Sequence, residues 1–208
     1  RVLRVKFWLG LFDDVKVDPD YAEAICDCEE HRELALKAAR ASIVLLKNED
    51  TLPLDESVAS IAVIGPSAAT ERLGGYAGHG VKVVTPWDGI QEKVRERGQS
   101  VTLVEGCALS EEEDPPAQGI AAAVKAADKA DVAILFMGNA VPQTEGEQRD
   151  RADLDLPGEQ EALIHQVCQT GTPTVVVLLN GSAVTMASWI DKMQAVVEAW
   201  YPGEEGGH

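Results

Sequence analysis

Two glutamates separated by a single glycine stand in the most highly charged segment of the chain, residues 143–151. Glu145 and Glu147 flank the glycine, and Arg149 and Arg151 follow within six residues. Cleavage of a glycosidic bond needs one carboxylic acid that protonates the leaving oxygen. It also needs a second carboxylate that acts on the anomeric carbon or on a water. A glutamate beside a glycine can serve as the first of these two groups.

The same residues also fit simpler explanations. A proton donor needs a raised pKa, which a neighbouring carboxylate or desolvation produces, whereas a nearby arginine lowers the pKa of a carboxyl group. Arg149 and Arg151 could instead pair with the acidic side chains of a solvated loop, which contributes little stability. A calcium site is a further alternative, although the spacing does not match an EF-hand loop. Composition alone leaves these alternatives open.

The pattern of apolar residues predicts the elements that position this segment. Short runs rich in β-branched residues predict strands, and longer amphipathic segments between them predict helices. The predicted strands are residues 61–64, 101–104, 132–137, 174–179 and 195–199, and the predicted helices are 87–97, 117–130, 158–170 and 186–193. The connections are too long for hairpins, and the strands are continuously apolar. We therefore predict a three-layer α/β sandwich with a mostly parallel sheet of about five or six strands flanked by helices.

Most of the predicted strands run directly into turns that contain glycine. In open parallel sheets, ligands bind beyond the carboxyl ends of the strands, where such turns let the backbone approach a ligand closely. The longest polar connection of this kind is 139–156, and it contains both glutamates. The sequence therefore places the candidate site at this edge of the sheet.

The first part of the chain has a different pattern. Residues 1–12 carry mostly apolar positions among a few basic ones and resemble the last helix of a preceding domain. Residues 13–19 resemble a linker, and 29–46 predicts a long amphipathic helix. We expect a piece of a longer protein, because the chain starts at Arg1 and ends on Gly-Gly-His208 without a closing element. The expected divisions are 1–19, a connecting helical segment at 20–57, and an α/β domain at 58–208 that is itself truncated.

Charge and motif spacing argue against several classes of function. The formal net charge of -17 disfavours nucleic acid and anionic membranes as partners. No apolar run approaches the roughly 20 residues that cross a bilayer. The turn at Gly65-Pro66 lacks the dinucleotide-binding glycine series, and Ser182 lacks the second glycine of a nucleophile elbow. The four cysteines and four histidines show no metal-ligand spacing, so we expect no cofactor and no metal, and the compartment stays unassigned.

Several stretches of the sequence resemble glycoside hydrolase family 3. The segment Glu145–Gln160 is similar to the family pattern in which an acid/base glutamate precedes Asp-Arg, an apolar pair and Leu-Pro-Gly-x-Gln. Further similar stretches follow in the family's order: Ala41–Asn48, taken as the helix before the second domain, Ile61–Pro66, Leu73–Gly78, Thr174–Ser182 and Glu198–Gly207. Together they span nearly the whole chain, which makes the resemblance specific.

The resemblance implies a two-domain retaining enzyme that hydrolyses terminal β-D-glucosyl or β-D-xylosyl residues. Its N-terminal (β/α)8-type barrel would hold the aspartate nucleophile, and Arg1–Phe12 is similar to the end of that barrel. The nucleophile motif is absent from this chain, so the chain alone is expected to be nearly inactive. Counting back from Asp150-Arg151, the acid/base position matches Glu147, with Glu145 as the alternative.

Other residues are expected to have supporting roles. Tyr76, in a glycine-rich loop, is a candidate for the substrate entrance, although it could also pack on its own domain. Arg151 is a candidate for substrate binding or for organising the loop. Trp189 is expected in the core, while Trp200 could face a sugar or the barrel. The expected partners are a β-glycoside and the barrel domain; the alternative function is a non-catalytic sugar-binding or scaffolding α/β domain.

Overall fold

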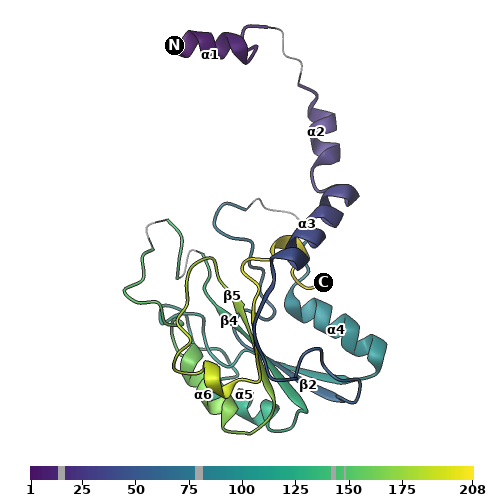
Figure 1. Cartoon of the computed structure of the whole chain (residues 1–208), viewed down its shortest axis with the longest axis vertical. Helices are drawn as coiled ribbons and strands as arrows, with labels where there is room; N and C mark the ends of the chain where they lie inside the picture. Colours follow the sequence, from purple (N-terminus) through teal and green to yellow (C-terminus); the bar gives the residue numbers. More distant parts are fainter. Residues whose placement is uncertain (14–16, 78–81, 142–143, 148) are drawn as a thin grey trace. The chain divides into compact units, whose positions relative to one another are not determined.

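The computed structural model of the 208-residue chain describes residues 1–13, 17–77, 82–141, 144–147 and 149–208. The chain divides into two compact units, Arg1–Leu34 and Ala35–His208 (Figure 1). Helix α3, Glu29–Ser42, contains the boundary between them. The candidate residues for chemistry all lie in the second unit.

The first unit consists of helices. They are α1 at Val2–Trp8, α2 at Pro19–Ile25 and the beginning of α3. The Asp18 side chain accepts a hydrogen bond of 3.0 Å from the backbone N–H of Tyr21, and Pro19 occupies the first helical position. Asp18 and Pro19, predicted as the end of a linker, therefore start a helix instead, because both are favoured there. None of the residues of α1 is buried.

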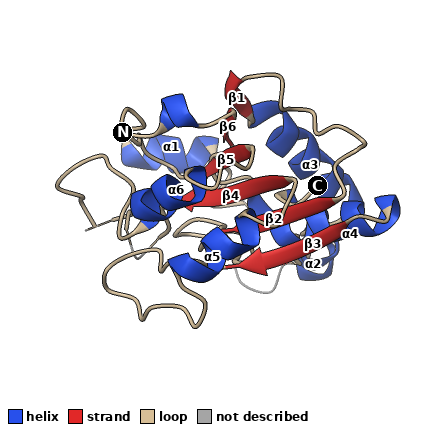
Figure 2. Cartoon of the chain, turned by 90° about the horizontal axis from the view of Figure 1, so that it is seen from below, coloured by secondary structure: helices blue, strands red, loops and turns tan. Residues whose placement is uncertain are grey.

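The second unit is built on a six-stranded sheet. Its strands are β1 at Val44–Asn48, β2 at Ser60–Ile64, β3 at Ser100–Val104, β4 at Val132–Gly138, β5 at Thr174–Leu179 and β6 at Ala195–Glu198. Their order across the sheet is β1-β6-β5-β4-β2-β3, as Figure 2 shows. Strands β2 to β6 are parallel to one another, and the edge strand β1 is antiparallel to β6. The predicted mostly parallel sheet is confirmed.

One strand was missed by the sequence analysis. The helix predicted to continue to residue 46 ends at Ser42, whose hydroxyl donates a 2.8 Å hydrogen bond to the carbonyl of Ala39. Val44–Asn48 then pairs with β6 as an edge strand, with Val44 opposite Glu198. Its apolar residues follow directly on the helical pattern of α3, so the sequence assigned them to the helix, although most of the strand is exposed. Pairing with the backbone of β6, interrupted by one register shift between Leu45 and Lys47, decides its conformation, and a short sequence window does not reveal this partner.

Helices cover both faces of the sheet, as predicted. They are α4 at Pro86–Arg97, α5 at Ile120–Ala127 and α6 at Gln160–Cys168. Two short 3₁₀ helices follow later in the chain, η1 at Ile190–Lys192 between β5 and β6, and η2 at Gly203–Glu205 after β6. Helix α4 packs on one face through Val94, while α5 and α6 pack on the other. Successive residues of each inner strand enter opposite clusters, as Val63 and Ile64 do. Among the described residues, no helix is long and apolar enough to cross a membrane.

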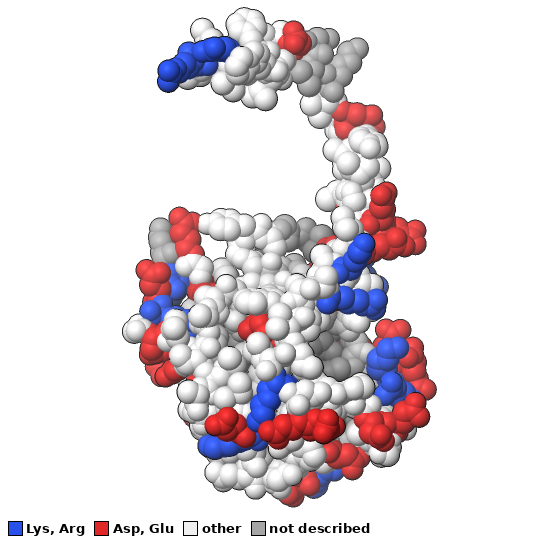
Figure 3. All heavy atoms as spheres, in the orientation of Figure 1, with Lys and Arg blue, Asp and Glu red and all other residues white. Residues whose placement is uncertain are grey.

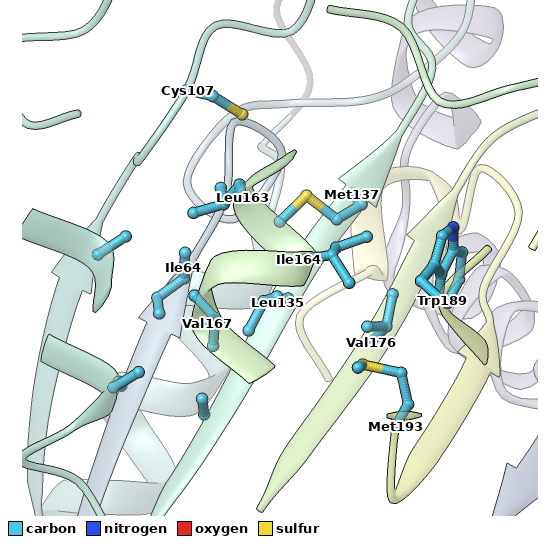
Figure 4. Packing of buried hydrophobic residues seen from close by; sticks show 14 of the residues in the cluster. Ile64, Cys107, Leu135, Met137, Leu163, Ile164, Val167, Val176, Trp189 and Met193 are labelled. Atoms are coloured by element: carbon cyan, nitrogen blue, oxygen red, sulfur yellow. The ribbon is translucent and has the colours of Figure 1, made fainter. Parts of the chain in front are cut away.

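The larger core cluster lies between the sheet and α6 (Figure 4). Leu163, Ile164 and Val167 of α6 are fully buried over β4 and β5. Trp189 and Met193 extend the cluster and are also fully buried, which confirms the predicted core position of Trp189. The helix predicted at 186–193 is wrong beyond the single turn of η1. The apolar residues of this segment reach the core from turns, so their spacing imitates a helix without requiring one.

Candidate functional site

Loops that follow four neighbouring parallel strands bring the candidate side chains to one edge of the sheet. Tyr76 follows β2, Glu145 and Glu147 follow β4, Ser182 follows β5, and Tyr201 follows β6. The four strands are parallel and adjacent, so their carboxyl ends share this edge. The loop after β4 is the green segment at the left of Figure 1.

Glu145 is held by both of its carboxylate oxygens. Its Oε1 accepts a hydrogen bond of 3.1 Å from the backbone N–H of Gly181 and another from the hydroxyl of Tyr201. Its Oε2 accepts a hydrogen bond of 2.8 Å from the hydroxyl of Ser182. The three donors come from the turns after β5 and β6. Hydrogen bonds to an ionised carboxylate are stronger than neutral ones, so Glu145 ties the loop to both turns.

Glu147 lies in a more open setting. Its side chain is exposed, and its Oε2 accepts a hydrogen bond from the hydroxyl of Tyr76. That hydrogen bond is the main reason why the pKa of the Tyr76 phenol lies above its ordinary value. The two side chains border an open hollow of about 520 Å³, which Gly75, Val141 and Gly146 also line. With 87% of its surface exposed, Tyr76 does not pack into the core of its own domain.

The glycine between the two glutamates allows their side chains to contact different loops. Gly146 has a φ of +108°, and a Cβ built on it would lie 2.8 Å from a methyl group of Val141. Glycine is the residue that adopts this conformation without strain. On its two sides, Glu145 reaches the turns after β5 and β6, while Glu147 reaches the loop after β2.

Arg151 holds the far end of the same loop. Its guanidinium donates hydrogen bonds to the carbonyl of Asp155 at 2.8 Å, the carbonyl of Ala183 at 3.0 Å and the hydroxyl of Ser182 at 3.3 Å. Arg149 forms an exposed ion pair of 3.3 Å with Glu112. In Figure 3, acidic and basic side chains are mixed at the left side of the second unit, where Figure 1 draws this loop. The arginines therefore hold protein groups, as a loop-organising role requires.

A buried glutamine explains part of the Leu-Pro-Gly-x-Gln segment. The side chain of Gln160, at the start of α6, is fully buried. Its Oε1 accepts a hydrogen bond of 2.8 Å from the N–H of Gly138, and its Nε2 donates to the carbonyls of Gly138, Leu109 and Pro157 at 2.9 to 3.2 Å. It thus fixes the end of β4, where the candidate loop begins. The sequence motif contained this residue but gave no role for it.

A buried carboxylate lies beneath the two turns that hold Glu145. Glu198, the last residue of β6, is 7% exposed, and burial raises its pKa above the ordinary value. It accepts hydrogen bonds from the backbone N–H of Trp200 at 2.9 Å and from Nδ2 of Asn180 at 3.3 Å. Asn180 in turn donates to the carbonyl of Ser182 at 2.9 Å. Sequence reasoning missed Glu198, because a single glutamate at the end of an apolar run carries no spacing signal.

The remaining candidates from the sequence lie away from this cluster or serve the fold. The indole N–H of Trp200 donates to the carbonyl of Ser42 at 3.1 Å, while 42% of the residue stays exposed. Burial raises the pKa of the Cys107 thiol to about 12, which keeps it protonated and unreactive. Within the described ranges, no group of three histidine, cysteine, aspartate or glutamate side chains is placed to bind a metal ion. Gly78 and Gln148, which belong to the two loops, lie outside the described residues.

Comparison with known families gives one match that covers most of the chain. Residues 43–208 match the family model of the glycosyl hydrolase family 3 C-terminal domain. The matched range begins at β1 and includes every loop of the candidate site.

Individual relatives agree with this match. The chain is 38% identical to a β-xylosidase of Formosa agariphila and 34% identical to a periplasmic β-glucosidase of Salmonella typhimurium. Both comparisons cover 100% of this chain but only 29% and 30% of the relative. The solved structure of a β-glucosidase of Erythrobacter marinus superposes with a TM-score of 0.85 at 33% identity, over 100% of this chain and 31% of that one. The chain therefore spans about a third of the length of these proteins.

Replacing Gln160 by leucine, written Gln160→Leu, tests the anchor at the end of β4. Leucine has a similar size but cannot bond the N–H of Gly138 or the three carbonyls around it, so buried polar groups lose their partner. We expect the free energy of unfolding to fall by about 2–4 kcal/mol in urea titrations. Gln166→Leu, on the exposed side of the same helix, is the control and should change it by less than about 0.5 kcal/mol. Equal effects of the two substitutions would contradict the anchoring role.

The raised pKa of Glu198 predicts a pH dependence of stability. The folded chain binds a proton at this carboxyl at a higher pH than the unfolded chain does, so ionisation of Glu198 lowers stability as the pH rises through the folded pKa. Glu198→Gln removes this ionisation; its amide oxygen can still accept from Trp200, but its Nε2 then faces Nδ2 of Asn180, and that hydrogen bond is lost at every pH. We therefore expect the stability of the variant relative to the parent to rise between the ordinary pKa of a glutamate and pH 7. Urea titrations at a series of pH values measure the difference in free energy of unfolding between variant and parent. A difference that does not change with pH would contradict a raised pKa of Glu198.

Proposed function

The chain belongs to glycoside hydrolase family 3, and we propose that it contributes the acid/base residue, Glu147, to a retaining β-glycosidase. The aspartate nucleophile of this reaction lies in a barrel domain outside these 208 residues. The observation that carries the proposal is the different environment of the two glutamates. Glu145 has both oxygens engaged by the protein, whereas Glu147 is exposed beside a hollow large enough for a ligand.

The reaction assigns two successive tasks to Glu147. As a carboxylic acid it protonates the glycosidic oxygen while the aspartate attacks the anomeric carbon and forms a glycosyl-enzyme intermediate. As a carboxylate it then removes a proton from the water that hydrolyses this intermediate. The two carboxyl groups must lie about 5–5.5 Å apart during the reaction, so the loop has to present Glu147 to the barrel. Exposure of Glu147 at the loop is the property that this geometry requires.

Tyr76 and Arg151 support this reaction in different ways. The exposed ring of Tyr76 borders the hollow beside Glu147, where a flat aromatic face can pack against a sugar ring. Its hydroxyl donates a hydrogen bond to Oε2 of Glu147, which holds the ring next to the proposed acid. We assign Arg151 to loop organisation, because its guanidinium is bonded to Asp155, Ser182 and Ala183. Direct contact of Arg151 with substrate is the weaker of the two roles.

The proposed substrates are terminal β-D-glucosides or β-D-xylosides. The relatives include proteins described as a β-xylosidase and a periplasmic β-glucosidase, at comparable identity over the whole chain. The proposed partner is the barrel domain, whose end we place at about residue 19. A connecting segment follows to about residue 57, and within it β1 already pairs with β6 of the α/β domain. Helix α1 fits this arrangement, because its apolar residues are exposed in the described chain, with Trp8 at 75%.

The division of the reaction between two domains predicts that the 208-residue chain is almost inactive. A proton donor without its nucleophile should hydrolyse nitrophenyl β-glucoside or β-xyloside at a rate close to that of the buffer alone. Calorimetric titration of the same chain with glucose, xylose and cellobiose tests the alternative of a self-contained sugar-binding domain. Saturable binding without the barrel would favour that alternative, and turnover typical of an intact enzyme would refute the division of labour.

The role of Glu147 is tested in an enzyme in which this chain follows its barrel domain. We expect Glu147→Ala to lower kcat/KM for substrates with poor leaving groups by about 10²–10⁴-fold, because these leaving groups need the proton. Substrates with good leaving groups should lose far less, and azide should partly restore turnover by attacking the intermediate. Glu92→Ala, in an exposed residue of α4, is the matched control. An equal loss on all substrates without azide rescue would move the acid/base role elsewhere.

A further inference from the structure

We propose that Glu145 is the positioning residue of this site, which holds the segment that carries Glu147 at a fixed place over the sheet edge. This inference rests on the proposed role of Glu147, and it gives the second glutamate of the pair a different task. Glu145 is bonded to the protein through three hydrogen bonds, which engage both of its carboxylate oxygens.

The close approach of Glu145 to the turn after β5 indicates a fitted contact. A Cβ built on Gly181 would lie 3.1 Å from Oε1 of Glu145 and 2.9 Å from a ring carbon of Tyr201. The carboxylate and the ring thus occupy the space that a side chain at this position would need. Gly181 lets its own N–H meet the carboxylate directly.

Two tie points, the hydrogen-bonded side chains of Glu145 and Arg151, flank Glu147 in the sequence. Glu145 binds the hydroxyl of Ser182 from one side, and Arg151 binds the same hydroxyl and the next carbonyl, that of Ala183, from the other. The carboxylate and the guanidinium therefore meet at one turn, although five residues separate them in the sequence. Glu147 lies on the short span between these tie points, which limits how far its carboxyl group can move.

The buried Glu198 supports both groups that hold Glu145. Through Asn180 it fixes the turn that presents Gly181 and Ser182, and through the N–H of Trp200 it fixes the turn that presents Tyr201. Trp200 has a φ of +57°, which is uncommon for a residue with a side chain. A hydrogen bond to a carboxylate helps to hold that conformation. Glu145 thus rests on turns that are themselves tied to the core.

Amide exchange of Gly181 in the 208-residue chain tests the contact without reference to catalysis. In Glu145→Ala the N–H loses its acceptor, and we expect its exchange to accelerate by about tenfold or more. In Glu145→Gln the amide oxygen can accept from Gly181 and Tyr201 while its nitrogen donates to Ser182, so exchange should stay near the parent rate. Glu92→Ala is the control. Unchanged exchange in Glu145→Ala would overturn the inference whatever the role of Glu147.

Kinetics in the barrel-containing enzyme then separate positioning from proton transfer. We expect Glu145→Ala to lower kcat by about 100-fold on good and poor leaving groups alike, without rescue by azide. Glu145→Gln should recover most of this loss and keep the pH profile of kcat/KM, whereas Glu147→Gln should lose the limb that reports the acid.

The kinetic results also distinguish failure of the inference about Glu145 from failure of the proposed role of Glu147. If Glu145→Gln is as slow as Glu145→Ala and azide rescues the alanine variant, Glu145 is the acid, and the inference and the proposed role of Glu147 both fail. If Glu147→Ala behaves as proposed while Glu145→Ala retains parental kcat, only the inference fails.

Discussion

The common direction of strands β2 to β6 is the constraint on which the site depends. Because these strands are parallel, each of them delivers its following loop to the same edge of the sheet. Glu145 can therefore bind Gly181 and Tyr201, which are 36 and 56 residues away in the sequence. An antiparallel arrangement would send alternate loops to opposite edges and separate these partners. The helices on both faces complete the core that keeps the strands in this arrangement.

The sequence predicted the inner part of the fold because burial on two faces leaves a plain signal there. The five parallel strands lie where they were predicted, and their ends differ from the predicted ones by one residue at most. Strands β2, β4, β5 and β6 are almost fully buried, whereas the edge strand β3 is only partly buried. The errors occur where burial is one-sided or irregular. Strand β1 is largely exposed and was assigned to a helix, and the segment around Trp189 reaches the core from turns. Pairing with β6 and packing against the sheet decide these two segments, and neither is visible locally.

The site was only partly predictable, for a related reason. The sequence identified the loop and both glutamates, but it could not separate Glu145 from Glu147, since they have the same chemistry on either side of one glycine. Residues on other loops make their surroundings differ: Ser182 and Tyr201 bond Glu145, whereas Tyr76 bonds Glu147. Glu198 was invisible for the same reason, because its partners are assembled only by the folded sheet.

Glu198 also indicates how stability and function are balanced in this domain. Burial makes its ionised form costly, as the raised pKa shows, and an apolar residue would suit the end of a core strand better. Its two hydrogen bonds shape the turns at Asn180 and Trp200, however, and those turns lie directly beneath the contacts of Glu145. A carboxylate that is unfavourable for the core therefore fits our proposal that the loop holds Glu145 in place and leaves Glu147 accessible.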